Sequence, residues 1–277
     1  MKQLGKRMIA GLFTLFVLLG GCRDKQEESS SSHPSISAPS DGGYQPQPPD
    51  VLDEMLAAKK KNSDVVGWLY IPNTTVDEAV VQTTNNEYYL RRDVEKRSDY
   101  AGCYYMDYES VMFDDGADLA QNSIIYGHNL GSPMGVKDDP NGVKFAQLLK
   151  LEDEQVAKDT PYIFFTTEAA VHVFEIFAAA YTEALTSPVP YHYAQYQPGQ
   201  LAELAEDMKR RSTYTYDVEV TDSDKILTLS TCTYKYGTYS QNDQQRYVVM
   251  ARLVQPGENY HETAVIEKNQ NIKEPSF

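Results

Sequence analysis

Short apolar stretches, several with strict alternation of apolar and polar residues, follow one another along the chain between residues 65 and 254. Such stretches are typical of buried or half-buried β-strands. They predict strands at 65–71, 75–82, 123–126, 162–166, 170–181, 214–220, 225–231 and 246–254. Turn residues such as Pro72 and Asn73 separate them, so the pattern predicts a mainly β fold with a closed or nearly closed eight-stranded barrel.

Three segments have helical periodicity instead. Residues 52–61, with apolar residues three and four apart, predict a helix ahead of the first strand. Residues 144–149 predict a short helix, and residues 200–211 predict an amphipathic helix within a long loop that precedes the last strands. Residues 102–106 are also strand-like, and we interpret their Cys103 as a packed apolar residue.

The first 21 residues read as a signal peptide. Three cations precede the apolar stretch 8–19, which is too short for a membrane span of about 20 residues but suits a signal-peptide core. The segment Leu19-Gly20-Gly21-Cys22 resembles a lipobox, which predicts lipidation of Cys22. An uncleaved signal anchor is the alternative. Either anchor predicts a protein held on the extracytoplasmic face of the cell membrane.

The remaining chain divides by composition into a tether, a domain and a tail. Residues 22–50 are rich in Ser and Pro, which predicts a flexible tether that spans roughly 30 Å on average. Residues 51–256 are long enough for one catalytic domain, and residues 257–277 form a C-terminal tail. The formal charge of −15 argues against nucleic acid as a partner.

A thiol, an imidazole and a guanidinium stand where strand-like stretches begin or end. Cys232 follows the stretch 225–231, Arg246 opens the next one, and His128 follows 123–126. A thiol with its free pKa of about 8.5 needs a neighbouring base or cation to attack a carbonyl group. Each residue alone is more often structural, but the three together predict a nucleophilic cysteine.

Metal and cofactor sites have no support in the sequence. It holds neither a Cys/His spacing for zinc nor a Gly-rich phosphate loop, so we expect no metal and no cofactor. The acidic groups at 114–118 and 138–139 lack the twelve-position calcium-loop pattern, and we interpret them as solvated loop charges.

These residues carry a resemblance to the sortases, the cysteine transpeptidases of Gram-positive bacteria, and most of all to class B. The similarity runs from about residue 52 to residue 254. Its motifs are T-L-x-T-C at 228–232, Y-G-H-N at 126–129 and R-x-V-V-x-A-K/R-L at 246–253, with further matches at 66–71, 80–82 and 86–90. Two features depart from the family pattern: the interval from Cys232 to Arg246 is long, and Thr233 stands where some relatives have an acidic residue.

The resemblance implies a sortase-type barrel and a transpeptidase. Cys232 would attack the carbonyl of a threonine in a C-terminal sorting motif of a secreted protein, His128 would act as acid and base, and Arg246 would stabilise the oxyanion. The acceptor would be an amine of a peptidoglycan stem peptide or a pilin lysine. Groove-lining substrate contacts are implied at Asn86, Leu90, Ser230 and Thr231, and the segment 186–212 would overhang the groove.

Other functions use part of the same chemistry. Papain-like peptidases normally place the cysteine before the histidine, whereas here His128 comes first, and the caspase signature is missing from the sequence. A lipoprotein that binds peptides or wall fragments without catalysis, and a peptidase that only hydrolyses, stay as alternatives. The sequence leaves the sorting motif, the acceptor amine and the choice between anchoring and pilus polymerisation open.

Overall fold

The computed structural model describes residues 43–131, 137–185 and 188–277. The predictions for the signal peptide, for Cys22 and for most of the tether lie outside the described residues. Residues 43–50 have no regular secondary structure. No helix in the described ranges is long and apolar enough to cross a membrane.

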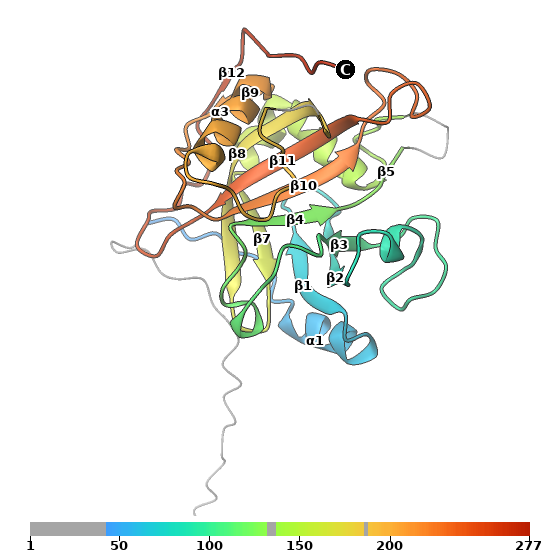
Figure 1. Ribbon diagram of the computed structural model, residues 1–277. Coiled ribbons are helices and arrows are strands. Elements are labelled where there is room, and N and C mark those ends of the chain that lie inside the picture. The colour runs from blue at the N-terminus through green and yellow to red at the C-terminus, as the bar shows by residue number, and fades with distance from the viewer. Residues whose placement is uncertain (1–42, 132–136, 186–187) are drawn as a thin grey trace, which may run out of the picture. The chain divides into compact units, whose positions relative to one another are not determined.

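Within these ranges eight strands close into a barrel in the order β1, β2, β3, β4, β10, β11, β8, β7. Figure 1 shows β4, β10 and β11 crossing the front of the barrel side by side. The interior is apolar, with β10 and β11 contributing fully buried residues such as Leu229 and Val249. The strands are β1 (Val65–Tyr70), β2 (Asp77–Gln82), β3 (Tyr104–Met106), β4 (Asn122–Tyr126), β7 (Tyr162–Thr166), β8 (Val171–Glu183), β10 (Ile226–Cys232) and β11 (Gln245–Leu253).

The predicted eight-stranded barrel is confirmed, but one of its strands was assigned wrongly. The segment predicted at 214–220 forms only β9 (Tyr214–Tyr216), which pairs outside the barrel with β12 (Ile266–Lys268). Its place is taken by β3, which pairs parallel to β2 and antiparallel to β4. Helix α3 (Gln200–Arg211) packs against β8 and leads into β9, so β9 follows α3 onto the outer layer instead of entering the barrel.

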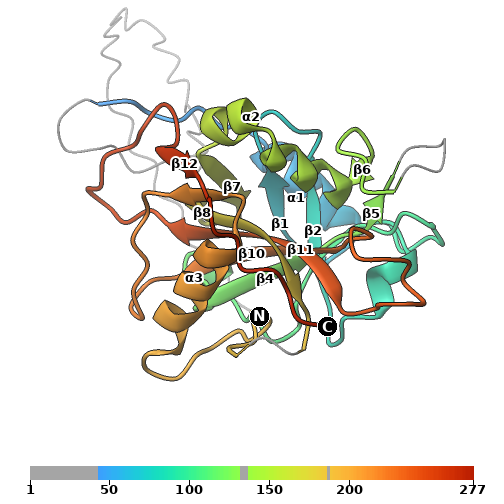
Figure 2. The same ribbon diagram turned by 90° about the horizontal axis from the view of Figure 1, so that it is seen from above.

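The helices surround the barrel at different places. Helix α1 (Leu52–Lys61) begins and ends as predicted and buries Leu52 and Met55. The short helix predicted at 144–149 is a 3₁₀ helix, η3 (Phe145–Glu152), which leads into α2 (Glu154–Asp159), whose first turn is capped by the Asp153 carboxylate. Figure 2 shows α3 across the barrel strands from α1 and α2. The remaining short elements are η1 (Tyr88–Arg91), η2 (Asp114–Gly116), β5 (Asn129–Leu130) and β6 (Val143–Lys144).

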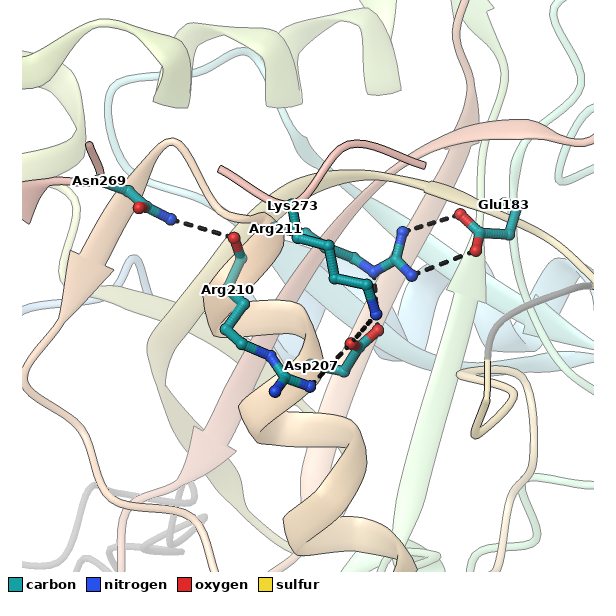
Figure 3. Close-up of polar contacts among 6 residues, drawn as sticks. All are labelled: Glu183, Asp207, Arg210, Arg211, Asn269 and Lys273. Carbon is teal, nitrogen blue, oxygen red and sulfur yellow. Dashed lines mark hydrogen bonds and ion pairs between the residues drawn. The ribbon is translucent and has the colours of Figure 1, made fainter. Parts of the chain in front are cut away.

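The C-terminal segment is bound to α3 through a charged cluster. The Lys273 ammonium lies 2.5 Å from Asp207, and its backbone N–H donates to the Arg210 carbonyl at 2.9 Å. Asp207 also accepts from Arg211, which makes two hydrogen bonds of 2.8 and 3.1 Å to Glu183 at the end of β8. Figure 3 shows this chain of contacts from the C-terminal segment through α3 to β8. The network therefore connects the tail to the strand end that leads into residues 184 and 185.

Candidate active site in a groove at one barrel rim

The strand directions bring the three predicted catalytic residues to one barrel rim. Strands β4 and β10 are parallel, with Tyr126 opposite Ser230, so both end at the same rim. His128 follows β4 by two residues and Cys232 is the last residue of β10. Strand β11 is antiparallel to β10 and starts at this rim, where Arg246 pairs directly with Cys232.

A groove of about 530 Å³ opens at this rim. All seven residues predicted to act or bind there line it, and their chemical roles stay predictions. Its described lining includes no Asp or Glu, although the chain contains 40 acidic residues. The lining residues are Asn86, Leu90, Arg91, Tyr105, Tyr126, Gly127, His128, Ala184, Leu185, Tyr191, His192, Ser230, Thr231, Cys232, Tyr239 and Arg246.

The imidazole of His128 is held from η1. Its Nε2 lies 2.8 Å from the Leu90 carbonyl oxygen and 2.7 Å from Nη1 of Arg91. Burial lowers the pKa of His128; the Leu90 carbonyl opposes this, whereas the positive charges of Arg91 and Lys144 lower it further. An uncharged imidazole is a proton acceptor, so this environment favours a base.

Cys232 and Arg246 share electrostatic neighbours. Burial raises the pKa of Tyr105; the charge of Cys232 adds to this and the charge of Arg246 opposes it, so this tyrosine lies within electrostatic reach of both. The Arg246 guanidinium is held by its own loop, since Nη1 donates to the Asp243 carbonyl at 2.6 Å and to the Gln245 carbonyl at 2.9 Å. The cation is thus held at the rim, on the residue that pairs with Cys232.

The hydroxyls predicted to contact substrate are engaged with the groove walls. Ser230 Oγ lies 3.0 Å from Tyr191 Oη, and Thr231 Oγ1 donates to the Gly127 carbonyl at 2.7 Å. Both side chains are buried although they line the groove. Their contacts fix the wall segments next to the thiol, whatever further contacts substrate makes.

Asp107 is a buried carboxylate that sequence reasoning missed. Its Oδ2 accepts from Asn86 Nδ2 at 2.8 Å and from Tyr126 Oη at 2.9 Å. Asn86 in turn accepts from the Tyr108 N–H at 3.1 Å. Asp107 therefore holds two groove-lining side chains, those of Asn86 and Tyr126, in place. The signal in the sequence was only an acidic residue directly after a strand-like stretch.

The interpretation of Asp138 as a solvated loop charge is wrong. Its carboxylate accepts from Asn129 Nδ2 at 2.6 Å, from Thr233 Oγ1 at 2.8 Å and from the Tyr234 N–H at 2.8 Å. Asn129 Nδ2 also donates to the Cys232 carbonyl at 3.0 Å. Asp138 thus ties the turn after His128 to the turn after Cys232. Thr233 is buried in this contact and faces Asp138.

The loop expected to overhang the groove contributes to it in part. Tyr191 and His192 line the groove from the part of this loop that precedes α3, next to Ala184 and Leu185, which come just before the loop, whereas no described residue of α3 lines it. Helix α3 buries Leu201, Leu204 and Met208 against the barrel instead. His192, which carries no sequence motif, was another groove residue that the sequence did not reveal.

Comparisons with known proteins agree with this geometry. The family model described as "Sortase domain" matches residues 69–254. Sortase B of Listeria monocytogenes is 31% identical over 206 residues, covering 74% of this chain and 76% of the relative. A Staphylococcus aureus sortase B–substrate complex has a TM-score of 0.60 at 25% identity and covers 73% of this chain and 85% of that one. A sortase B complexed with triglycine also has a TM-score of 0.60, at 26% identity, with coverage of 74% and 87%.

The residues matched by the family model include His128, Cys232 and Arg246 and the strands β4, β10 and β11 that place them. The solved relatives share the closed barrel and are sortases of class B. Because the family model covers more than half of the chain and a relative is more than 30% identical, the protein belongs to the sortase family of cysteine transpeptidases, and within it to class B.

Proposed function

We propose that this sortase cleaves a C-terminal sorting motif of secreted proteins after a threonine and transfers the new carboxyl end to an amine. The observation that carries the proposal is the presence of a thiol, an imidazole and a guanidinium in the lining of one groove of about 530 Å³. That volume suits a short extended peptide segment better than a folded partner.

The reaction then runs in two balanced halves. The Cys232 thiol gives its proton to His128 and its sulfur forms a bond to the threonine carbonyl carbon. When the scissile C–N bond breaks, His128 returns the proton to the leaving amine, and a thioacyl-enzyme remains. The incoming amine loses a proton to His128 as it attacks, the C–S bond breaks, and the thiol is restored.

Arg246 supplies charge where the carbonyl oxygen becomes negative. Its guanidinium stays protonated at any working pH and offers several donors in a rigid fork. The carbonyls of Asp243 and Gln245 fix one end of the fork, which reduces the reorganisation needed during the reaction. Resemblance to a sortase B complexed with triglycine supports a peptide amine as acceptor.

We further propose that the enzyme works on the extracytoplasmic face of the cell membrane. The N-terminal apolar stretch, the lipobox-like Leu19-Gly20-Gly21-Cys22 and the Ser/Pro-rich tether support this location. An anchor through diacylglycerol on Cys22, with about 0.8 kcal/mol per buried CH₂, would hold the protein firmly. The substrates would then be secreted proteins, and the acceptor a peptidoglycan stem peptide or a pilin lysine.

Intact-mass analysis tests the proposal. Purified protein and its Cys232→Ala variant are incubated with a library of threonine-containing sorting peptides, with and without triglycine as acceptor. We expect an adduct on Cys232 that converts to a peptide–triglycine product. Adducts that resolve only to free acid would favour a hydrolase, and peptide binding without any chemistry dependent on Cys232 would favour a binding lipoprotein.

A further inference from the structure

Arg91 contacts His128 but has no part in the proposed transfer reaction. It is the last residue of η1 and lines the groove. Its Nη1 lies 2.7 Å from His128 Nε2 and donates to the Tyr100 carbonyl at 2.8 Å. Its guanidinium lies over the Tyr100 ring, 4.6 Å from the centroid. The aromatic ring and the carbonyl together hold the cation against the imidazole.

The two contacts at His128 Nε2 require different forms of the ring. A guanidinium only donates hydrogen bonds, so Arg91 needs a lone pair on Nε2, which places the proton of a neutral ring on Nδ1. The Leu90 carbonyl only accepts, so it needs an N–H at Nε2. The imidazolium has N–H groups at both nitrogens and is compatible with Leu90 alone. Arg91 and Leu90 therefore compete for one nitrogen atom.

Other charges around His128 do not replace Arg91. Lys144 of β6 acts in the same direction but is paired with Glu78, whose carboxylate lies 2.5 Å from its ammonium. The same groove is also lined by Cys232 of β10, Arg246 of β11, His192 and four tyrosines, Tyr105, Tyr126, Tyr191 and Tyr239. No carboxylate is present in the described lining to offset the positive charge.

We propose, on the basis of the proposed transpeptidase function, that Arg91 is a positioning residue which controls the proton of His128. In the free enzyme Arg91 holds the ring uncharged with its proton on Nδ1. The proton of the Cys232 thiol then goes to Nε2, the only ring nitrogen with a lone pair; the new Nε2–H donates to the Leu90 carbonyl, and Arg91 moves off the ring, retained by Tyr100. The contact thus disfavours a charged histidine before substrate chemistry begins.

Nitrogen-15 NMR of the His128 ring tests this directly, because its shifts report both the tautomer and the titration midpoint. The measurement uses the Cys232→Ala background, so that the thiol does not titrate with the ring. The test variant is Arg91→Gln, and Arg91→Lys keeps the charge. Arg92→Gln is the matched control, since Arg92 makes equivalent contacts to Tyr88, with a 2.7 Å bond to its carbonyl and a ring distance of 4.3 Å.

We expect Arg91→Gln to move the midpoint to higher pH by about one pH unit, the usual scale for loss of an adjacent like charge. Its neutral ring should also change from the Nδ1–H to the Nε2–H tautomer. Arg91→Lys should retain most of the low midpoint, and Arg92→Gln should change neither property. An unchanged midpoint in Arg91→Gln, or an equal change in Arg92→Gln, would overturn the proposal.

A rate measurement separates this inference from the proposed function. With a peptide that forms an adduct on Cys232, kcat/KM is measured as a function of pH. In Arg91→Gln, the pH at which kcat/KM changes through titration of His128 should move together with the NMR midpoint. If no peptide reacts, the transpeptidase proposal fails while the NMR result still decides the role of Arg91. If peptides react but this pH stays in place, the inference about Arg91 fails alone.

Discussion

Replacing Arg211 with methionine should destabilise the barrel far more than replacing Arg210, its exposed neighbour on α3. Arg211 bonds to Glu183 at 2.8 and 3.1 Å and to Asp207 at 2.7 Å, and all three side chains are at most 4% exposed. Methionine keeps the length of the side chain but leaves Glu183 buried without these bonds. Loss of one partner of a buried ion pair costs about 3–5 kcal/mol. For a domain of this size, that is a fall in Tm of about 6–20 °C.

Arg210→Met is the matched control. Arg210 lies one position earlier on α3 and contacts the same Asp207 at 3.0 Å, but its side chain is 62% exposed. An exposed ion pair contributes about 0–1 kcal/mol. Urea unfolding followed by circular dichroism gives the free energy of unfolding of each variant, and the two can be compared if their m-values agree. If Arg211→Met costs no more than Arg210→Met, the buried network does not stabilise the fold as argued.

The pH dependence of the Arg211→Met deficit provides a second check. Burial alone would raise the pKa of Asp207, but the bonds from Lys273 and Arg211 outweigh it and hold this pKa below its ordinary value. Wild type therefore gains stability above the ordinary carboxyl pKa and loses it as pH falls through the lower, folded-state pKa. Arg211→Met removes one of these bonds, so the variant has less of this stabilisation to lose. The gap between the two proteins should therefore shrink as pH falls below the ordinary carboxyl pKa of about 4.

Three further changes probe the site. Arg246→Lys keeps the charge but loses the fork, so turnover of an adduct-forming peptide should fall by roughly a hundredfold, measured as kcat, with unchanged circular dichroism. Gly127→Ala would place a Cβ 2.8 Å from a Phe145 ring atom and 2.9 Å from one of Tyr104. The clash should displace the adjacent His128 and lower kcat/KM roughly a hundredfold. Wild-type activity in this variant would contradict the role of Gly127 in placing His128. Because burial raises the pKa of the Cys103 thiol to about 12, peptide mapping after mild alkylation should find label on Cys232 but not on Cys103.

The error at residues 214–220 shows what alternation reports and what it does not. Tyr214, Tyr216, Val218 and Val220 are all at most 8% exposed, so the pattern was right about burial. Period-two alternation identifies one buried face, but it does not say which strand pairs with that segment. The true barrel strand β3 lies within the stretch 102–106, which the sequence marked as strand-like, but its three residues are too few for a periodic signal that would assign it to the barrel.

The same distinction applies to the candidate site: sequence patterns located the reactive groups but not the residues that hold them. The thiol, imidazole and guanidinium stand at strand ends, where motif and strand pattern coincide, so sequence reasoning found them. Arg91, Asp107 and Asp138 lie at or beyond the ends of short elements. Arg91 contacts His128 across 37 positions of sequence, and Asp107 contacts Asn86 and Tyr126 across 21 and 19. Asp138 contacts Thr233 and Tyr234 across 95 and 96 positions. No local pattern encodes such contacts. They depend on how the closed barrel brings its rim segments together.

The strands and the rim segments therefore have separable roles. Pairing of β4, β10 and β11 brings the three reactive groups to one rim. Their orientation comes from elsewhere: Leu90 and Arg91 act on His128, and Asn129 with Asp138 holds the backbone at Cys232. Many strand contacts are buried and contribute to stability, whereas the Arg91 contact is exposed and contributes little. Changes at Arg91 should therefore alter proton transfer with little effect on unfolding, whereas changes inside β10 should alter both.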